Sequence, residues 1–364
     1  MITRAPGKLM LSGEWSVLEL GNPSIVLAVD RFVSADIKTN DSIVLEAKNL
    51  SLKTKAVFDG KQLKLIDLPE EGRLSELKHA VETALIYLCE KKEIIPFHLS
   101  VSSEQTFGNG DQGEVKLGFG SSAALTVASI AGILQLHGLA TESDEDRLRL
   151  YKLACISHYH AQGKIGSAFD IAASCYGGAI QYKRFDGSWL SGQLGRPLNE
   201  LVAMDWPHLL IQPLPLPESF RLVVGFSGIS ASTKELVLKM RDYKAKHLAD
   251  YDYLIGRISK TSEQIVQAIV KKDEEEIIAG LKDNRLLLKL LGERSGLDLE
   301  SAELNTVINL MDGFGAAKFS GAGVGDCAIG VCFSAEAEEH MKRALHEEGH
   351  LVDVSLSDKG VYHG

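Results

Sequence analysis

Three glycine-rich segments, far apart in the sequence, carry residues that could bind a phosphate group. Motif A is "APGKLMLSGEW" (residues 5–15), motif B is "KLGFGSSAALTVA" (116–128) and motif C is "KFSGAGVGDCAIG" (318–330). In motif B, the glycines let the backbone curve closely around an anion, and the apolar run behind them predicts a helix over about 121–137. The start of a helix presents unpaired N–H groups and a positive dipole end, both of which favour phosphate.

Motif B alone leaves alternatives open. Ser121 or Ser122 could equally cap an ordinary helix. The segment lacks the G-K-[ST] of a Walker A loop, whereas Gly118, Gly120 and Ala123 fit the relaxed dinucleotide pattern G-x-G-x-x-A. That pattern should follow a buried strand, and "GNGDQGEVKL" is too polar to form one. We therefore do not expect a nicotinamide cofactor.

Motifs A and C help to decide between these interpretations of motif B. Gly321, Gly323 and Gly325 alternate between two strand-like segments, which is more glycine than a hairpin needs. Close approach of this backbone to a phosphate, or to motif B, explains them better. Lys8 of motif A lies between a turn and an apolar strand, where a surface lysine is the ordinary interpretation. Each glycine turn alone is ambiguous, whereas the three together, in this order, form a specific pattern.

The elements that must position these motifs are of mixed type. The first hundred residues contain mostly strand patterns, with one helix predicted in "LSELKHAVETALIYLCEKK". After motif B and its helix we predict another helix in "DEDRLRLYKLACISHYHAQG" and a short one in "SAFDIAASCYGG". The prolines of "IQPLPLPESFRLVVGFSG" predict a linker that leads into a second region of four helices, then strand, turn, strand, helix and strand. Without regular βα alternation, this order predicts α+β domains, which we place at 1–215 and 216–364.

Composition excludes several classes of partner. The 364 residues carry a formal net charge of −10, so neither nucleic acid nor a membrane is expected as partner. Five cysteines without a C-x-x-C pair argue against a disulfide framework or zinc site. No signal-peptide pattern and no apolar run of about 20 residues is found, so we expect a cytoplasmic protein. His158 and His160, two apart on a predicted helix, face different ways and are not expected to share a metal.

The three motifs resemble those of the galactokinase, homoserine kinase, mevalonate kinase and phosphomevalonate kinase (GHMP) superfamily, whose middle motif is usually P-x-x-x-G-L-G-S-S-A-A. The resemblance extends over almost the whole chain and looks closest to the phosphomevalonate kinases, through "AQGKIGSAFDIAASCYGG", "GFSGISASTKELV" and Asp326 before Cys327. The chain departs from the pattern at Phe119, where leucine is usual, and at Ala168 and Val324, where glycine is usual.

The resemblance implies a fold and a reaction. The N-terminal domain would be ribosomal-protein-S5-domain-2-like and the C-terminal domain ferredoxin-like, both α+β, with the active site in the cleft between them. The reaction would convert ATP and (R)-5-phosphomevalonate to ADP and 5-diphosphomevalonate in the mevalonate pathway of isoprenoid synthesis, with Mg2+, in a monomer or homodimer. The alternatives are a mevalonate kinase, another member with an alcohol acceptor, and a non-catalytic member that regulates a partner.

The resemblance also assigns roles to residues. Lys8 and Lys116 would face the transferring phosphoryl group, and Asp170 is the candidate catalytic aspartate. Because a phosphate monoester is largely dianionic at pH 7, we expect Asp170 to orient Lys8, the acceptor or magnesium rather than to act as a strong base. Whether Arg285 is structural or contacts substrate stays open. The ATP phosphates would bind Gly118, Gly120, Ser121, Ser122 and Ala123, with Ser122 also on Mg2+, and the substrate would bind among Ser167, Ser230, Ser232, Thr233, Lys234, Gly321, Ala322 and Gly323.

Overall fold

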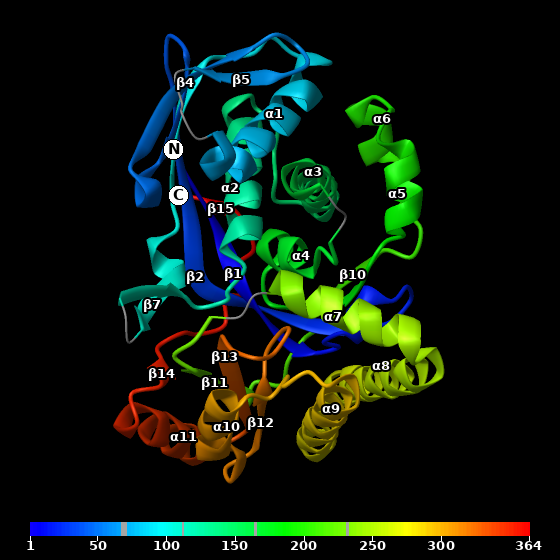
Figure 1. The fold of residues 1–364 in the computed structure, drawn as a ribbon. Helices are drawn as coiled ribbons and strands as arrows, with labels where there is room; N and C mark the ends of the chain where they lie inside the picture. The colour runs from blue at the N-terminus through cyan, green and yellow to red at the C-terminus, as the bar shows by residue number, and fades with distance from the viewer. Residues whose placement is uncertain (67–70, 111–112, 164–165, 231–232) are drawn as a thin grey trace.

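A computed structural model of the chain describes residues 1–66, 71–110, 113–163, 166–230 and 233–364. The larger of its two main β-sheets forms the upper part of the molecule (Figure 1). Its strand order is β10-β9-β2-β6-β3-β4-β5, with β1 against β2 and β15 against β1. All pairs are antiparallel except β3 with β6. The strands are β1 Ile2–Ser12, β2 Ser24–Thr39, β3 Ile43–Ala47, β4 Leu52–Phe58, β5 Leu63–Ile66, β6 Phe97–Ser102, β9 Ala179–Lys183, β10 Leu210–Pro213 and β15 Tyr362–His363.

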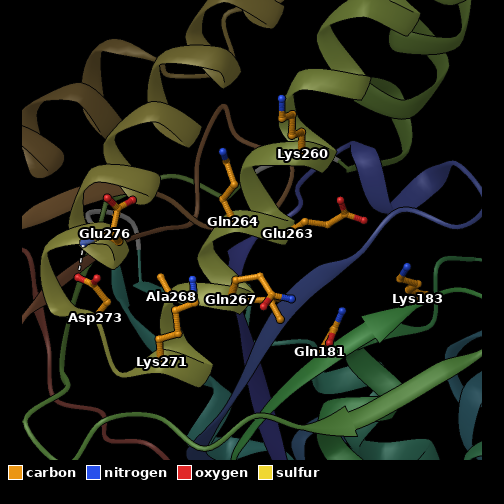
Figure 2. A pocket seen from close by; sticks show the side chains of 11 residues that line it. Gln181, Lys183, Lys260, Glu263, Gln264, Gln267, Ala268, Lys271, Asp273 and Glu276 are labelled. Atoms are coloured by element: carbon orange, nitrogen blue, oxygen red, sulfur yellow. Dashed lines mark hydrogen bonds between the residues drawn. The ribbon is translucent and has the colours of Figure 1, made fainter.

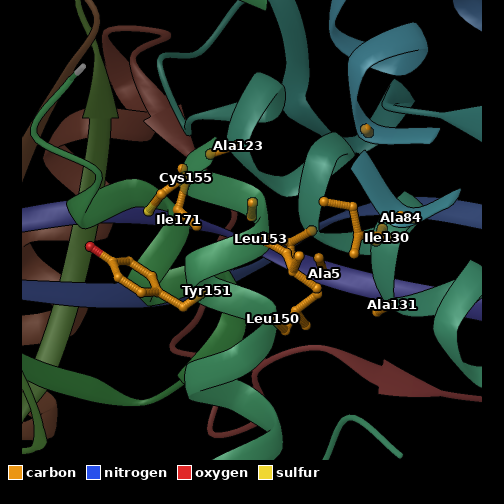
Figure 3. Close-up of a cluster of buried hydrophobic side chains, with 14 of the residues drawn as sticks. Ala5, Ala84, Ala123, Ile130, Ala131, Leu150, Tyr151, Leu153, Cys155 and Ile171 are labelled. Atoms are coloured by element: carbon orange, nitrogen blue, oxygen red, sulfur yellow. The ribbon is translucent and has the colours of Figure 1, made fainter. Parts of the chain in front are cut away.

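Four helices lie over this sheet, in segments where the sequence predicted helices; three of them contact its strands, and the third in chain order packs on the other three (Figure 1). They are α1 Ser75–Cys89, α2 Ser121–Leu136, α3 Asp144–Gln162 and α4 Phe169–Tyr176. The Ser143 side chain caps α3 by accepting a hydrogen bond from the Asp146 N–H, and Gly163 ends it with φ 67°. Figure 3 shows the resulting core, in which Ile130 of α2 and Leu153 of α3 are fully buried. This packing fixes where α2 and α4 begin.

Two short helices between β9 and β10 were not predicted from the sequence. They are α5 Gly187–Gln193 and α6 Leu198–Ala203, which lie beside α3 in Figure 1. Asp186 caps α5 by accepting hydrogen bonds from two N–H groups, and Trp206 anchors the segment in the core. Each helix spans about two turns or fewer, which is too short to show a helical period in sequence.

The smaller sheet is antiparallel with the order β12-β13-β11-β14. Its strands are β11 Arg221–Phe226, β12 Ala316–Phe319, β13 Cys327–Cys332 and β14 Leu351–Val352. Helices α9 Glu274–Ser295, α10 Ala302–Asp312 and α11 Ala335–Glu347 contact its strands. Helix α8 Leu248–Lys271 packs on α9, and α7 Thr233–Lys246 packs on α8 (Figure 1). A separate hairpin, β7 Phe107–Gly110 with β8 Gly113–Lys116, leads into motif B. Two mixed layers of this kind confirm the predicted α+β class.

The two sheets share an apolar cluster. Leu9 and Leu11 of β1 pack with Phe220 and with Ile265 of α8, so the strand that carries motif A belongs to both halves. The chain passes from the larger to the smaller sheet between β10 and β11, and β15 returns to pair with β1. The division at 215/216 stays a prediction. None of the described helices combines the length and the apolar character that a membrane span requires.

Candidate active site

Motifs A and B touch through Lys8. Its backbone N–H donates a 2.8 Å hydrogen bond to the Phe119 carbonyl, and its Nζ donates a 2.7 Å hydrogen bond to the Gly118 carbonyl. The Phe119 side chain is fully enclosed in the apolar cluster between the sheets and so anchors the loop. The Lys8 ammonium group is therefore held at the loop that precedes α2.

The loop of motif B has the conformation that its glycines permit. Gly118 and Gly120 have φ of 77° and 75°, in the left-handed region that residues with a Cβ avoid. Gly120 is the N-cap of α2, and no side chain caps the helix. The first helical hydrogen bond runs from Ala124 N–H to the Gly120 carbonyl, which leaves the preceding donors without intrahelical partners. This start of α2 suits an anion better than the serine-capped helix that we considered as an alternative.

Asp170 and Lys8 both lie next to Gly120. A Cβ built on Gly120 would be 3.2 Å from Cγ of Lys8 and 3.5 Å from Cβ of Asp170. Asp170 is in the first turn of α4, and its Oδ1 accepts a 3.0 Å hydrogen bond from the Ile171 N–H. The N-cap before it, Ala168, has φ 60°, so this chain keeps a left-handed turn where the family usually has glycine. The structure thus brings Lys8, the motif B loop and Asp170 together.

Motif C closes against motif B through Asp326 and Cys327. A Cβ on Gly118 would lie 2.7 Å from Cγ of Asp326. Asp326 accepts a 3.1 Å hydrogen bond from the Ser230 hydroxyl, and the Cys327 thiol donates one of 3.1 Å to the Leu117 carbonyl. Burial raises the pKa of the Cys327 thiol far above its ordinary value, so it packs as a neutral group. Motif C therefore joins the motif B loop to the segment before α7.

Backbone contacts to Leu299 hold the turn of motif C. Gly323 has φ 87°, and a Cβ there would lie 2.3 Å from the Leu299 carbonyl oxygen. The same carbonyl accepts a 2.8 Å hydrogen bond from the N–H of Val324, which has φ 71°. Only glycine fits at the first position, whereas valine at the second is strained. The loop geometry typical of glycine is therefore kept at Val324.

A buried ion pair, which the sequence analysis missed, connects motif A to motif C. Glu14 and Lys318 are both enclosed, and Lys318 donates hydrogen bonds to the Glu14 carboxylate and, at 2.7 Å, to the Phe319 carbonyl. Burial raises the pKa of Glu14, against the opposing attraction of Lys318. The sequence signal that could have revealed this ion pair was Glu14, an acidic residue among the apolar and small residues of "LMLSGEW".

Ser122 has two neighbours that were also not predicted. Its Oγ donates a 3.2 Å hydrogen bond to Oε1 of Glu76 in the first turn of α1, and it lies 3.3 Å from Nε2 of His158. His158 is 2.7 Å from Nε2 of Gln162, whereas His160 stacks on His79, so the two α3 histidines point differently. Hydroxyl and carboxylate oxygens are ligands that Mg2+ accepts, so this donor set fits the ion that the resemblance implied.

The remaining residues predicted for the site form no hydrogen bond or ion pair with Lys8, Asp170 or Ser122 among the described residues. Lys116 ends β8 with an exposed side chain that forms no hydrogen bond or ion pair among the described residues. Ser167 accepts a 2.5 Å hydrogen bond from the Tyr182 hydroxyl through its carbonyl. Ser232 lies outside the described residues, and so does the side chain of Lys234 in the first turn of α7. Gly321 and Ala322 are partly buried on the motif C turn.

Arg285 is structural. Its guanidinium group donates hydrogen bonds of 2.8 and 3.0 Å to the Glu300 carboxylate and lies 3.1 Å from Asp312. Burial opposes ionisation of Glu300, but the hydrogen bonds and charge of Arg285 outweigh it and lower the pKa of Glu300. The pair fixes the segment next to Leu299, on which motif C rests.

A polar pocket between β9 and α8 lies apart from the three motifs. Figure 2 shows lysine, glutamine and acidic side chains around it, from β9, from α8 and from the start of α9. None of the residues predicted for the site lines this pocket. Its lining consists of Gln181, Lys183, Lys260, Glu263, Gln264, Val266, Gln267, Ala268, Lys271, Asp273 and Glu276.

Known proteins share both the sequence pattern and the fold. The family models for the GHMP kinases N terminal domain and the GHMP kinases C terminal domain match residues 78–178 and 265–351. A phosphomevalonate kinase of Streptomyces sp. (strain CL190) is 30% identical over 96% of this chain and 95% of its own length. One from Saccharolobus solfataricus is 29% identical, with coverage of 98% and 97%.

The fold agrees with that of a solved relative. The structure of Streptococcus pneumoniae phosphomevalonate kinase in complex with phosphomevalonate and AMPPNP has a TM-score of 0.81 to this chain. It is 21% identical, and the match covers 98% of this chain and 99% of that one. The order of the two family domains, the near full-length relatives and the shared fold lead to one conclusion: this chain belongs to the GHMP kinase family.

Proposed function

We propose that this GHMP kinase transfers the γ-phosphoryl group of ATP to 5-phosphomevalonate, giving ADP and 5-diphosphomevalonate. The observation that carries the proposal is the Lys8 ammonium group, held 2.7 Å from the Gly118 carbonyl at the uncapped start of α2 and close to Asp170. The acceptor is supported by the two relatives named phosphomevalonate kinase. A cytoplasmic location and a monomeric or dimeric state remain predictions from the sequence.

The phosphates of ATP would bind at the start of α2. The N–H groups of Ser121, Ser122 and Ala123 lack intrahelical acceptors, and the helix dipole adds positive potential there. Phosphoryl transfer needs positioning and charge stabilisation more than covalent help from the protein. Lys8 would stabilise the charge that develops on the transferring group. Lys116, on the strand that leads into the loop, would add a second cation once ligands are bound.

Asp170 would act by orientation. It lies next to Gly120, as Lys8 does, so its carboxylate can orient the ammonium group or the acceptor without removing a proton. The acceptor phosphate is already largely dianionic at pH 7 because its second pKa is about 6. A strong base is therefore unnecessary in this reaction, unlike in a reaction with an alcohol.

The substrate would lie between motif C and the start of α7. Gly321 and Ala322 are partly buried and Gly323 is buried on the turn of motif C, and α7 begins at Thr233 directly after Ser232. Ser232, Lys234 and Ser167 would bind its phosphate. A Mg2+ ion held at Ser122 would neutralise charge on the ATP phosphates.

Release of ADP with different acceptors tests the proposal. We expect ADP release with phosphomevalonate, little with mevalonate and little without acceptor. Lys8→Met should remove the activity, whereas Lys61→Met, at an exposed lysine in the turn before β5, should not. Preference for mevalonate would favour a mevalonate kinase. Nucleotide binding with no ADP release for any acceptor would favour a non-catalytic, regulatory member of the family.

A further inference from the structure

The helices α1 and α2 begin side by side, and the first turn of each carries a side chain with an oxygen atom that faces the other helix. Glu76 is in the first turn of α1, and its Oε1 accepts a 3.2 Å hydrogen bond from Oγ of Ser122 in the first turn of α2. The two residues are 46 positions apart in the sequence. The carboxylate is therefore brought to the phosphate loop by tertiary packing.

Among the residues that the structure describes, the charge of Glu76 meets no counter-ion: it forms no ion pair, and the Ser122 hydroxyl is the donor that it meets. A carboxylate at this place would repel the phosphates of ATP, which the proposed function puts at the start of α2. A cation between the two anions removes that repulsion.

We infer that Glu76 is a ligand of the divalent cation that accompanies ATP, together with Oγ of Ser122. Mg2+ takes one or two carboxylates, other oxygen ligands from the protein, phosphate oxygens and water in an octahedral arrangement. The inference rests on the proposed function, because the nucleotide supplies the phosphate oxygens. It assigns to α1 a role in metal binding that motifs A, B and C do not provide.

A change of Glu76 to glutamine separates this role from a structural one. Glutamine keeps the size of the side chain and an oxygen that accepts from Ser122, but it removes the charge. Loss of a ligand or of its orienting partner weakens metal binding by about 10- to 100-fold. Metal-free nucleotide should bind Glu76→Gln as tightly as wild type or more tightly, because the repelling carboxylate is gone. If Glu76 only held the motif B loop or the start of α2 in place, nucleotide affinities with and without metal would fall together.

The experiment uses the full chain, with Mn2+ as the metal probe and AMPPNP as the nucleotide. Electron paramagnetic resonance measures free Mn2+ at saturating AMPPNP, and calorimetry measures AMPPNP binding in EDTA. Glu145→Gln, an exposed glutamate in the first turn of α3, is the matched control. We expect weaker Mn2+ binding in Glu76→Gln alone, with metal-free AMPPNP affinity unchanged or increased. Unchanged Mn2+ affinity, or equal losses with and without metal, would overturn the inference. Failure of wild type to bind Mn2+ with AMPPNP would instead refute the proposed function.

Discussion

Replacing Gly118 by alanine should destabilise the protein by two separate mechanisms. The residue has φ 77°, and the left-handed conformation costs a residue with a Cβ about 1–2 kcal/mol. The new Cβ would also lie 2.7 Å from Cγ and 2.8 Å from Oδ2 of Asp326, and overpacking of this kind costs about 1–3 kcal/mol. The sum predicts a loss of about 2–5 kcal/mol in the free energy of unfolding.

A matched glycine isolates the first mechanism. Gly296, the C-cap of α9, has φ 66°, and no atom lies within 4 Å of the Cβ that alanine would add. Gly296→Ala should therefore cost only about 1–2 kcal/mol. Asp326→Gly removes the side chain that the Gly118 variant meets, and Asp326 itself has φ 61°, which glycine tolerates. The double variant Gly118→Ala/Asp326→Gly should thus recover about 1–3 kcal/mol relative to the sum of the single changes.

Urea unfolding, followed by tryptophan fluorescence, measures these differences in the free energy of unfolding. They appear as shifts of the unfolding midpoint while the m-value, the dependence of that free energy on urea concentration, stays constant. ADP release should fall more steeply than stability in Gly118→Ala, because the carbonyl of Gly118 holds Nζ of Lys8. Equal losses for Gly118→Ala and Gly296→Ala, without coupling to Asp326, would refute the contact between motifs B and C.

Three further predictions concern single residues. Asp170→Asn should lower kcat by about 100-fold through lost orientation, and raising the pH should not restore the rate, as it would if a base were missing; a pH–rate profile decides. Glu300→Gln should reduce the loss of unfolding free energy on acidification, measured by urea unfolding between pH 6 and 3. Arg285 lowers the pKa of Glu300 in the folded protein, so the ionised Glu300 contributes its full stabilisation above its ordinary pKa of 4.5. That stabilisation is lost as the pH falls through the lower folded pKa. Ala168→Gly should raise the free energy of unfolding by roughly 0.5–1 kcal/mol, because φ at this position is 60°; no gain would contradict the left-handed N-cap.

The fold was predictable where local signals were strong. Helix α3 has a capping serine before it and a glycine after it, and α2 follows a glycine turn with a long apolar run, so both were predicted within about two residues. The short helices α5 and α6 were missed because they depend on tertiary packing around Trp206 rather than on a repeating pattern.

The site was predictable where backbone conformation dictates residue type. The glycines of motifs B and C marked two turns that do meet, at Gly118 and Asp326. Glu76 and His158 left no such mark, because their place beside Ser122 follows from how α1 and α3 pack on α2. Lys116 was chosen for its closeness in sequence, yet its side chain is exposed, so its contact with ligand stays a prediction.

The identity of the phosphoryl acceptor is the central claim, and 31P nuclear magnetic resonance of the reaction mixture tests it directly. With ATP, Mg2+ and phosphomevalonate, we predict loss of the phosphate monoester signal and growth of two mutually coupled diphosphate signals beside those of ADP. Lys8→Met should leave the spectrum unchanged. Release of inorganic phosphate alone, or a new monoester signal when mevalonate replaces phosphomevalonate as the better acceptor, would contradict the claim.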